Sequence, residues 1–335
     1  MEMEKTGIAV AGSIVADLYY EIDTYPQQGM LTAIRATHGA VGGTGNLIMD
    51  LARLDSSMPI RVSALVGEDD SGEMILRTLA KYPNVDIRNV TREGVSSVDH
   101  VMEPRDTRQR TFFYQAGAND IYDERFIDWE VLDSRIFHLE YLLLMARVDA
   151  PDEEFGTHGA KILHDARARG MRTSVDMVSG QDALASSVVP PALAYTDYCT
   201  INETEAEAVT GIAVKDSASA ARALEALQGF GVSRWAVIHS PHCSYGLDCE
   251  TGRMVVSPSL KLPRGFIQGT TGAGDAYCSG ILYGAYTDLP LEKALDFAAA
   301  VAACSLSGIN GTEGVRTAAE VWKLREMYPV YKEVL

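Results

Sequence analysis

The glycine-rich stretch Gln268-Gly-Thr-Thr-Gly-Ala-Gly-Asp-Ala-Tyr277 leads into 276–285, an apolar segment of small residues that predicts a buried helix. Unpaired N–H groups at a helix N-terminus carry partial positive charge and attract anions. Gly272 and Gly274 would let the backbone approach such a ligand closely, because neither has a Cβ. Asp275 would then lie beside an anion site, where phosphoryl transfer needs a base. Taken alone, these residues favour the simpler interpretation of a capped helix after a Gly-rich turn.

The composition is that of a globular protein with 335 residues, of which 47% are hydrophobic and 22% charged. The formal net charge of −17 argues against nucleic acid or an anionic membrane surface as a partner. Five cysteines without a C-x-x-C pair are typical of a reducing compartment. The sequence has no apolar run of about 18 residues and no signal-peptide pattern at its start. We therefore expect no membrane span and a cytoplasmic protein.

Apolar strands alternate with helices along most of the chain. Strands are expected at 7–12, 60–66, 136–144, 171–177, 197–202, 235–239 and 254–256, and helices at 46–54, 71–82, 152–169, 218–227, 276–285, 291–306 and 317–327. This alternation predicts an α/β fold, a doubly wound and mostly parallel sheet with helices on both faces, as one domain over 1–335.

Two polar, β-prone segments, at about 18–38 and 96–116, depart from this alternation. We expect them to form one small β-sheet that projects from the edge of the main sheet. A second Gly-rich turn is expected at Gly39-Ala-Val-Gly-Gly-Thr-Gly45, just before the first helix.

Four stretches together resemble motifs of the PfkB/ribokinase family of carbohydrate kinases. They are Gly12-Ser-Ile-Val-Ala-Asp17, Gly42-Gly-Thr-Gly-Asn46, Asn202-Glu-Thr-Glu205 and Thr270-Thr-Gly-Ala-Gly-Asp275. They occur in the family's order over nearly the whole chain, and Val66-Gly-Glu-Asp-Asp-Ser-Gly72 and Gly117-Ala-Asn119 add weaker matches. The resemblance implies a ribokinase-like α/β domain in which the small β-sheet acts as a lid.

The same resemblance implies ATP-dependent phosphorylation of a hydroxyl group on a sugar. Asp275 matches the family's catalytic base, which takes the proton from the attacking hydroxyl. The backbone of Gly272, Ala273 and Gly274 matches the anion hole that stabilises charge on the transferring phosphoryl group.

Further residues match the family's substrate contacts. Asp17 matches a residue that grips sugar hydroxyls, a role that suits a carboxylate because it accepts two hydrogen bonds. Gly42, Gly43 and Asn46 match the turn that contacts the sugar. Arg110, on an expected lid strand, is a further candidate for contact with substrate or phosphate, although an exposed Arg on a polar strand is usually only solvated.

Other matches concern ATP and Mg²⁺. Asn202 and Glu205 match the N-x-x-E motif near Mg²⁺ and the phosphates, with Glu205 holding the ion through water. Their spacing also fits a capping box, and both roles are compatible. Ser240, Gly246 and Thr270 are the remaining candidates for nucleotide contact.

The chain departs from the family pattern at three places. Gly269 stands where many members have an Asp that helps to hold a monovalent cation, so the resemblance does not carry that cation site over to this chain. The Gly42-Gly43 pair is one residue nearer to Asn46 than is common. The stretch His239-Ser-Pro-His-Cys-Ser-Tyr-Gly246 also differs from the usual nucleotide-side pattern.

Several alternatives remain open at this point. The acceptor could be a nucleoside, because the family includes nucleoside kinases. A non-catalytic sugar sensor and a dinucleotide-binding oxidoreductase are less favoured, the second because Gly272-Ala-Gly-Asp-Ala-Tyr277 does not complete G-x-G-x-x-G. Because lid edges in this family often pair between subunits, a homodimer through the lid is also an expectation.

Overall fold

A large mixed sheet forms the centre of the molecule. The computed structural model describes residues 5–107, 109–308 and 312–332, so the ends of the domain expected over 1–335 lie outside the described residues. The nine strands of the sheet are, in spatial order, β15 (Arg253–Pro258), β14 (Cys243–Asp248), β13 (Trp235–His239), β12 (Tyr198–Asn202), β11 (Arg172–Met177), β8 (Ile136–Leu142), β1 (Ile8–Gly12), β4 (Ile60–Val66) and β5 (Val85–Arg92). Neighbours from β13 to β5 pair in parallel, whereas β14 and β15 extend the sheet in antiparallel.

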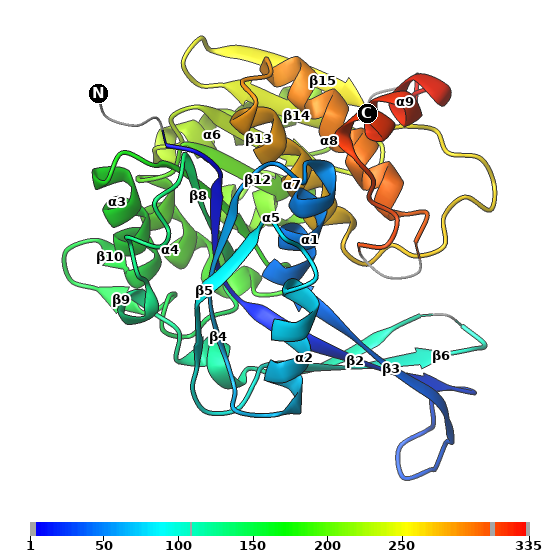
Figure 1. Ribbon diagram of the computed structural model, residues 1–335. Helices are drawn as coiled ribbons and strands as arrows, with labels where there is room; N and C mark the ends of the chain where they lie inside the picture. Colours follow the sequence, from blue (N-terminus) through cyan, green and yellow to red (C-terminus); the bar gives the residue numbers. More distant parts are fainter. Residues whose placement is uncertain (1–4, 108, 309–311, 333–335) are drawn as a thin grey trace.

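Helices cover both faces of this sheet (Figure 1). One face carries α1 (Thr44–Leu54), α2 (Asp70–Leu79), α7 (Ala273–Tyr286) and α8 (Leu291–Ser305), with α9 (Ala318–Met327) packed on α8. The other face carries α3 (His158–Ala168), α4 (Asp182–Leu193), α5 (Glu203–Thr210) and α6 (Ser217–Phe230). Apolar strands are buried between the two helical layers, and the two largest clusters of buried apolar residues include side chains from these strands. The expected doubly wound α/β fold is confirmed.

A separate four-stranded sheet projects from the body beside α2 (Figure 1). Its order is β3 (Ile34–Gly43), β2 (Ile14–Ile22), β6 (Val98–Pro104) and β7 (Thr111–Gln115). The expected small sheet therefore exists, and its first two strands reach further into the body than 18–38. The Gly-rich turn expected at 39–45 is wrong, because β3 continues to Gly43 and α1 begins at the next residue. Gly43 turns the chain between them with a left-handed φ of 59°.

Some elements differ from the sequence-based expectation. The helix expected at 152–169 begins only at His158, because β9 (Pro151–Asp152) and β10 (Gly156–Thr157) form a short antiparallel pair before it. Helix α4 was not expected, since it contains Pro190 and Pro191, which remove backbone donors. Two short 3₁₀ turns, η1 (Gly117–Asp120) and η2 (Glu124–Phe126), follow β7.

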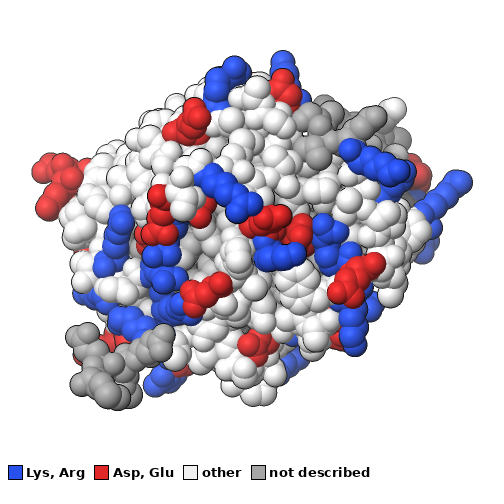
Figure 2. Space-filling view, turned by 90° about the horizontal axis from the view of Figure 1, so that it is seen from above, with Lys and Arg blue, Asp and Glu red and all other residues white. Residues whose placement is uncertain are grey.

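The surface charges are mixed. Figure 2 shows acidic and basic side chains interspersed over the face seen from above, with neutral surface between them. Among the described helices, none is long and apolar enough to cross a membrane.

Close packing of α7 on α8 generates a stability prediction. A Cβ built on Gly280 would lie 2.5 Å from the Cα of Ala298, so Gly280→Ala must push the helices apart. We expect it to lower the free energy of unfolding by about 1–3 kcal/mol. Gly229 in α6 has open space around it, so Gly229→Ala is the matched control and should raise the free energy of unfolding by about 0.5–1 kcal/mol. Urea unfolding monitored by circular dichroism measures both, and equal midpoints for the two variants would contradict this packing.

Candidate active site

Asp275 lies in the first turn of α7 and is only 8% exposed. The N-cap residue of α7 is Gly272, whose left-handed φ of 74° favours glycine, and the helix has no side-chain cap. The capped helix favoured by the local sequence alone is therefore not what forms. Asn46 donates from Nδ2 to one carboxylate oxygen of Asp275 at 2.9 Å, and the Tyr141 hydroxyl donates to the other.

The electrostatics around Asp275 are unusual, because other carboxyl groups are buried nearby. Burial raises the pKa of Asp275, while the hydrogen bonds from Tyr141 and Asn46 oppose that rise. Carboxylate oxygens of Glu140, Asp176 and Asp275 lie within 4.8 Å of one another. Burial and the mutual repulsion of these groups raise the pKa of Glu140 and of Asp176 well above the usual range.

A cavity of about 280 Å³, which we call the lid-side cavity, lies between the small sheet and α1. Its lining includes Asp17, Tyr19, Asn46, Arg53, Lys81 and Thr271. Desolvation, together with the nearby charge of Asp99, raises the pKa of Asp17 to about 7. Gly42 pairs with Val15 across the β2–β3 pair, and a Cβ on Gly42 would lie 2.5 Å from a carboxylate oxygen of Asp17. Glycine at this position therefore makes room for the Asp17 side chain.

A second cavity of about 480 Å³, which we call the strand-end cavity, lies where β11 and β12 end. Its lining includes Phe112, Asp176, Asn202, Glu205, Gly272, Gly274 and Asp275. The capping box is present: Asn202 accepts from the N–H groups of Thr204 and Glu205 at 2.9 Å, and Glu205 accepts from the N–H of Asn202 at 2.8 Å. The other carboxylate oxygen of Glu205 accepts a hydrogen bond from the Ser179 hydroxyl at 2.6 Å. Burial raises the pKa of Glu205 to about 7.

Asp275 connects the two cavities. It lines the strand-end cavity, while its hydrogen-bond partner Asn46 lines the lid-side cavity. Arg110 joins the lid to the same region, since it donates to the hydroxyl of Thr271 and forms an ion pair with Glu103 at 2.6 Å. Its guanidinium also lies over the ring of Tyr19, 5.3 Å from the ring centre. Side chains from α1 and β8 thus converge on the carboxylate of Asp275, and Arg110 connects the lid to the loop just before α7.

A sequence model of the pfkB family of carbohydrate kinases matches residues 5–318. The chain belongs to this family. The ribokinase of Haemophilus influenzae is 23% identical over 334 residues, which cover 97% of this chain and 99% of the relative. These matches confirm the resemblance inferred from the motifs, and membership makes the protein a phosphotransferase with an alcohol group as acceptor.

Solved structures confirm the ribokinase-like fold. A structure of Arabidopsis thaliana ribokinase complexed with ribose and ATP has a TM-score of 0.80 and 21% identity, with 96% of this chain and 99% of that chain covered. The nucleoside kinase of Methanocaldococcus jannaschii, an archaeal member of the ribokinase family, has a TM-score of 0.75 and 18% identity, with 96% and 99% covered.

Not all of the candidate residues of this pfkB kinase line the two cavities. Gly43 lies against the carbonyl oxygen of Ser13, 2.2 Å from where a Cβ would stand, and like Gly42 it lines neither cavity. The Ser240 hydroxyl donates to the carbonyl of Cys243 at 2.9 Å. Gly246, in the middle of β14, faces the side chains of Leu291 and Leu295 on α8. Thr270 is exposed, and its carbonyl lies 3.4 Å from the N–H of Ala273.

Sequence reasoning missed three residues around Asp275, namely Glu140, Tyr141 and Asp176. Glu140 and Tyr141 interrupt the apolar strand β8, and Asp176 comes near the end of β11. A carboxylate near the carboxyl end of a buried parallel strand is a signal that was available, because ligands bind at that edge of α/β sheets. The pairing of Tyr141 with Asp275, which are 134 residues apart, had no local signal.

Proposed function

We propose that this pfkB family member is an ATP-dependent kinase that phosphorylates a hydroxyl group of a small carbohydrate, with Asp275 as the general base. The observation that carries the proposal is the position of Asp275 between two cavities. Phosphoryl transfer needs the acceptor hydroxyl beside the base and in line with the phosphoryl group of the donor, and this arrangement provides a separate space for each substrate next to Asp275.

The lid-side cavity suits the acceptor. Asp17 and Asn46 offer hydrogen-bonding groups of the kind that sugar hydroxyls need. Its volume of about 280 Å³ lies at the lower end of ligand cavities, which favours a single sugar over a nucleoside. Arg53 and Lys81 also line it, and the described residues place no carboxylate within ion-pair distance of either. Sugar acids therefore belong among the acceptors to be tested.

The N-terminus of α7 suits the transferring phosphoryl group. The helix has no side-chain cap. The N–H of Ala273 donates to the carbonyl of Thr270 at 3.4 Å, and among the described residues the N–H groups of Gly274 and Asp275 have no acceptor, so these two can meet a ligand. The nearest atom to a Cβ on Gly274 would be 3.9 Å away, on His239, so this glycine leaves the approach open. Together with the helix dipole, these donors stabilise negative charge that develops on the phosphoryl oxygens.

Glu205 is the candidate for holding Mg²⁺ through water. Its carboxylate lines the strand-end cavity, and both oxygens already accept hydrogen bonds, from Ser179 and from the N–H of Asn202. These bonds fix the orientation of the group while leaving lone pairs for a water molecule. Mg²⁺, when bound, neutralises charge on the phosphates.

Asp275 takes the proton of the attacking hydroxyl in this proposal. Asn46 and Tyr141 each hold one of its oxygens, so the carboxylate has a fixed orientation at the junction of the two cavities. Neither donor uses all the lone pairs of its oxygen, so one remains for the incoming proton. The five cysteines are all free, which supports action in a reducing compartment such as the cytoplasm.

The first test replaces the proposed base. Asp275→Asn keeps the size of the side chain but removes its basicity, so we expect turnover of ATP with a sugar acceptor to fall about 10²–10⁴-fold. Binding of ATP and of acceptor, measured by calorimetry, should survive. The acceptor panel comprises pentoses, hexoses, keto-sugar acids and nucleosides. Asp288→Asn, beyond the far end of α7, is the matched control and should retain activity. An active Asp275→Asn enzyme would refute the assignment of Asp275 as the general base. If nucleosides are the best acceptors in the panel, the protein is a nucleoside kinase instead of a sugar kinase.

The second test concerns pH. A general base works only when it is deprotonated, and burial raises the pKa of Asp275, so activity should fall at a higher pH than for an ordinary carboxyl group. The hydrogen bond from Tyr141 lowers the pKa of Asp275, so Tyr141→Phe should raise that pKa further. We expect the acid limb of the kcat profile to move to higher pH in Tyr141→Phe. Tyr286→Phe, at the opposite end of α7, should leave the profile unchanged. A shift to lower pH would contradict this role of Tyr141.

A further inference from the structure

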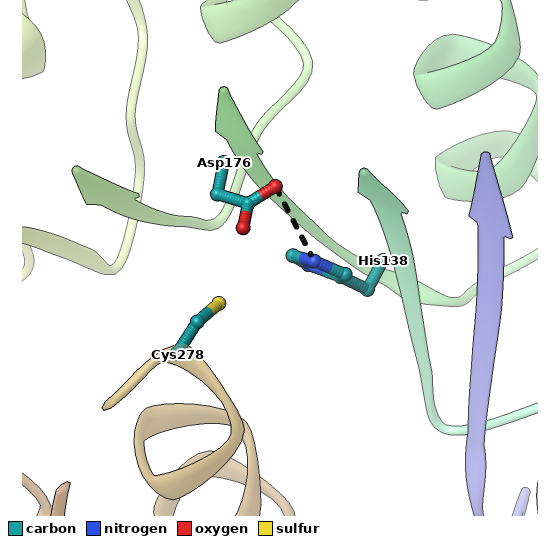
Figure 3. Close-up of side chains that lie close together, drawn as sticks. All are labelled: His138, Asp176 and Cys278. Carbon is teal, nitrogen blue, oxygen red and sulfur yellow. Dashed lines mark ion pairs between the residues drawn. The ribbon is translucent and has the colours of Figure 1, made fainter. Parts of the chain in front are cut away.

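Three metal-binding residue types meet behind Asp275. His138 on β8, Asp176 on β11 and Cys278 on α7 are 0%, 6% and 1% exposed. Figure 3 shows their side chains pointing toward one another from the two strands and the helix. One potential ligand atom from each lies within 4.8 Å of the others. They come from three separate segments of the chain, so tertiary packing alone brings them together.

Side-chain atoms of His138, Asp176 and Glu140 that face this space have no hydrogen-bond partner among the described residues. His138 uses Nδ1 for a hydrogen bond with the Ser174 hydroxyl at 3.0 Å, which fixes the ring and leaves Nε2 pointing into the cluster. Nε2 lies 3.7 Å from Oδ1 of Asp176 and 3.8 Å from Oε2 of Glu140, and neither oxygen has a partner. Buried polar atoms are nearly always paired, so several unpaired atoms facing one point indicate a missing ligand.

The spacing of these atoms distinguishes a metal ion from direct hydrogen bonds. Separations of 3.7 and 3.8 Å are too long for a hydrogen bond. Two ligands of one tetrahedral metal ion lie about 3.3–3.8 Å apart, because each bond is about 2.0–2.3 Å long. The separation of 3.7 Å between Nε2 of His138 and Oδ1 of Asp176 falls within that range, and a ligand atom of Cys278 lies within 4.8 Å of both residues.

The carboxyl groups of Glu140 and Asp176 also have no Lys or Arg side chain as an ion-pair partner among the described residues. Their only ion-pair partner there is His138. Buried carboxylates without compensation are costly, and a bound cation would remove much of that cost.

We propose that His138, Asp176 and Cys278 bind a divalent transition-metal ion of the Zn²⁺ class. An imidazole nitrogen and a thiolate select Zn²⁺ or Co²⁺ over Mg²⁺, which prefers oxygen ligands. Ser174 is the positioning residue, because its hydroxyl orients the ring of His138. Asp176 and Cys278 line the strand-end cavity, which provides an entry path. The proposal does not depend on the identity of the acceptor or on Asp275 acting as a base.

Co²⁺ is the probe for this site, because its absorption reports both geometry and thiolate ligation. The full-length protein is stripped with a chelator and titrated with Co²⁺, and bound metal is measured by elemental analysis. We expect one Co²⁺ per chain, tetrahedral absorption bands, a thiolate charge-transfer band, and displacement of Co²⁺ by Zn²⁺.

Cys278→Ser should lose the charge-transfer band, and His138→Gln should weaken binding at least tenfold. Ser174→Ala should weaken binding about 10–100-fold while keeping all the ligands. Cys304→Ser, a buried cysteine on α8, is the matched control and should behave as wild type.

Two results would overturn the proposal. One is the absence of Co²⁺ and Zn²⁺ binding in the wild-type protein. The other is binding without a thiolate band in the wild type, or with a band that disappears equally in Cys304→Ser. The wild-type protein alone shows whether Co²⁺ and Zn²⁺ bind, so the proposal can be tested even if a variant fails to fold. Circular dichroism of each variant identifies such a failure.

Discussion

The candidate active site of this kinase depends on the burial of several carboxyl groups at one edge of the main sheet. Asp50, Glu140, Asp176, Glu205 and Asp275 are each at most 8% exposed, although carboxylates strongly prefer water. They are tolerated because the positive end of α7 points at this edge and because Asn46, Tyr141 and Ser179 donate hydrogen bonds there. Burial nevertheless raises the pKa of all five carboxyl groups.

The lid is connected to the main body at the same edge. Strand β2 starts two residues after the end of β1, so the small sheet continues directly from a strand of the main sheet. Asp17 lies on β2 against Gly42 of β3, and β3 runs without a loop into α1, which supplies Asn46. A movement of the lid would therefore move Asp17, and the start of α1 would follow through the chain itself. Arg110 adds a side-chain connection from the lid to Thr271.

Much of the fold could be predicted from the sequence. Strands such as 60–66 and 235–239 match in full, because a buried parallel strand is a short apolar run that local sequence alone displays. The failures also have local causes. Helix α4 was missed because Pro190 and Pro191 normally end helices, and glycines 39–45 suggested a turn although β3 and α1 use them for close approach of Asp17 and Ser13.

The sequence by itself determined the family, the fold and the position of Asp275 at the start of a helix, since each of these depends on motifs that are continuous in the chain. Only the tertiary structure decided what surrounds that carboxylate. Asn46, Tyr141 and Asp176 come from α1, β8 and β11, and their meeting depends on strand order and helix packing, which no single segment encodes. It also decided that α7 lacks a side-chain cap, so the loop that local sequence favoured as a capped helix start keeps its N–H groups available for a ligand.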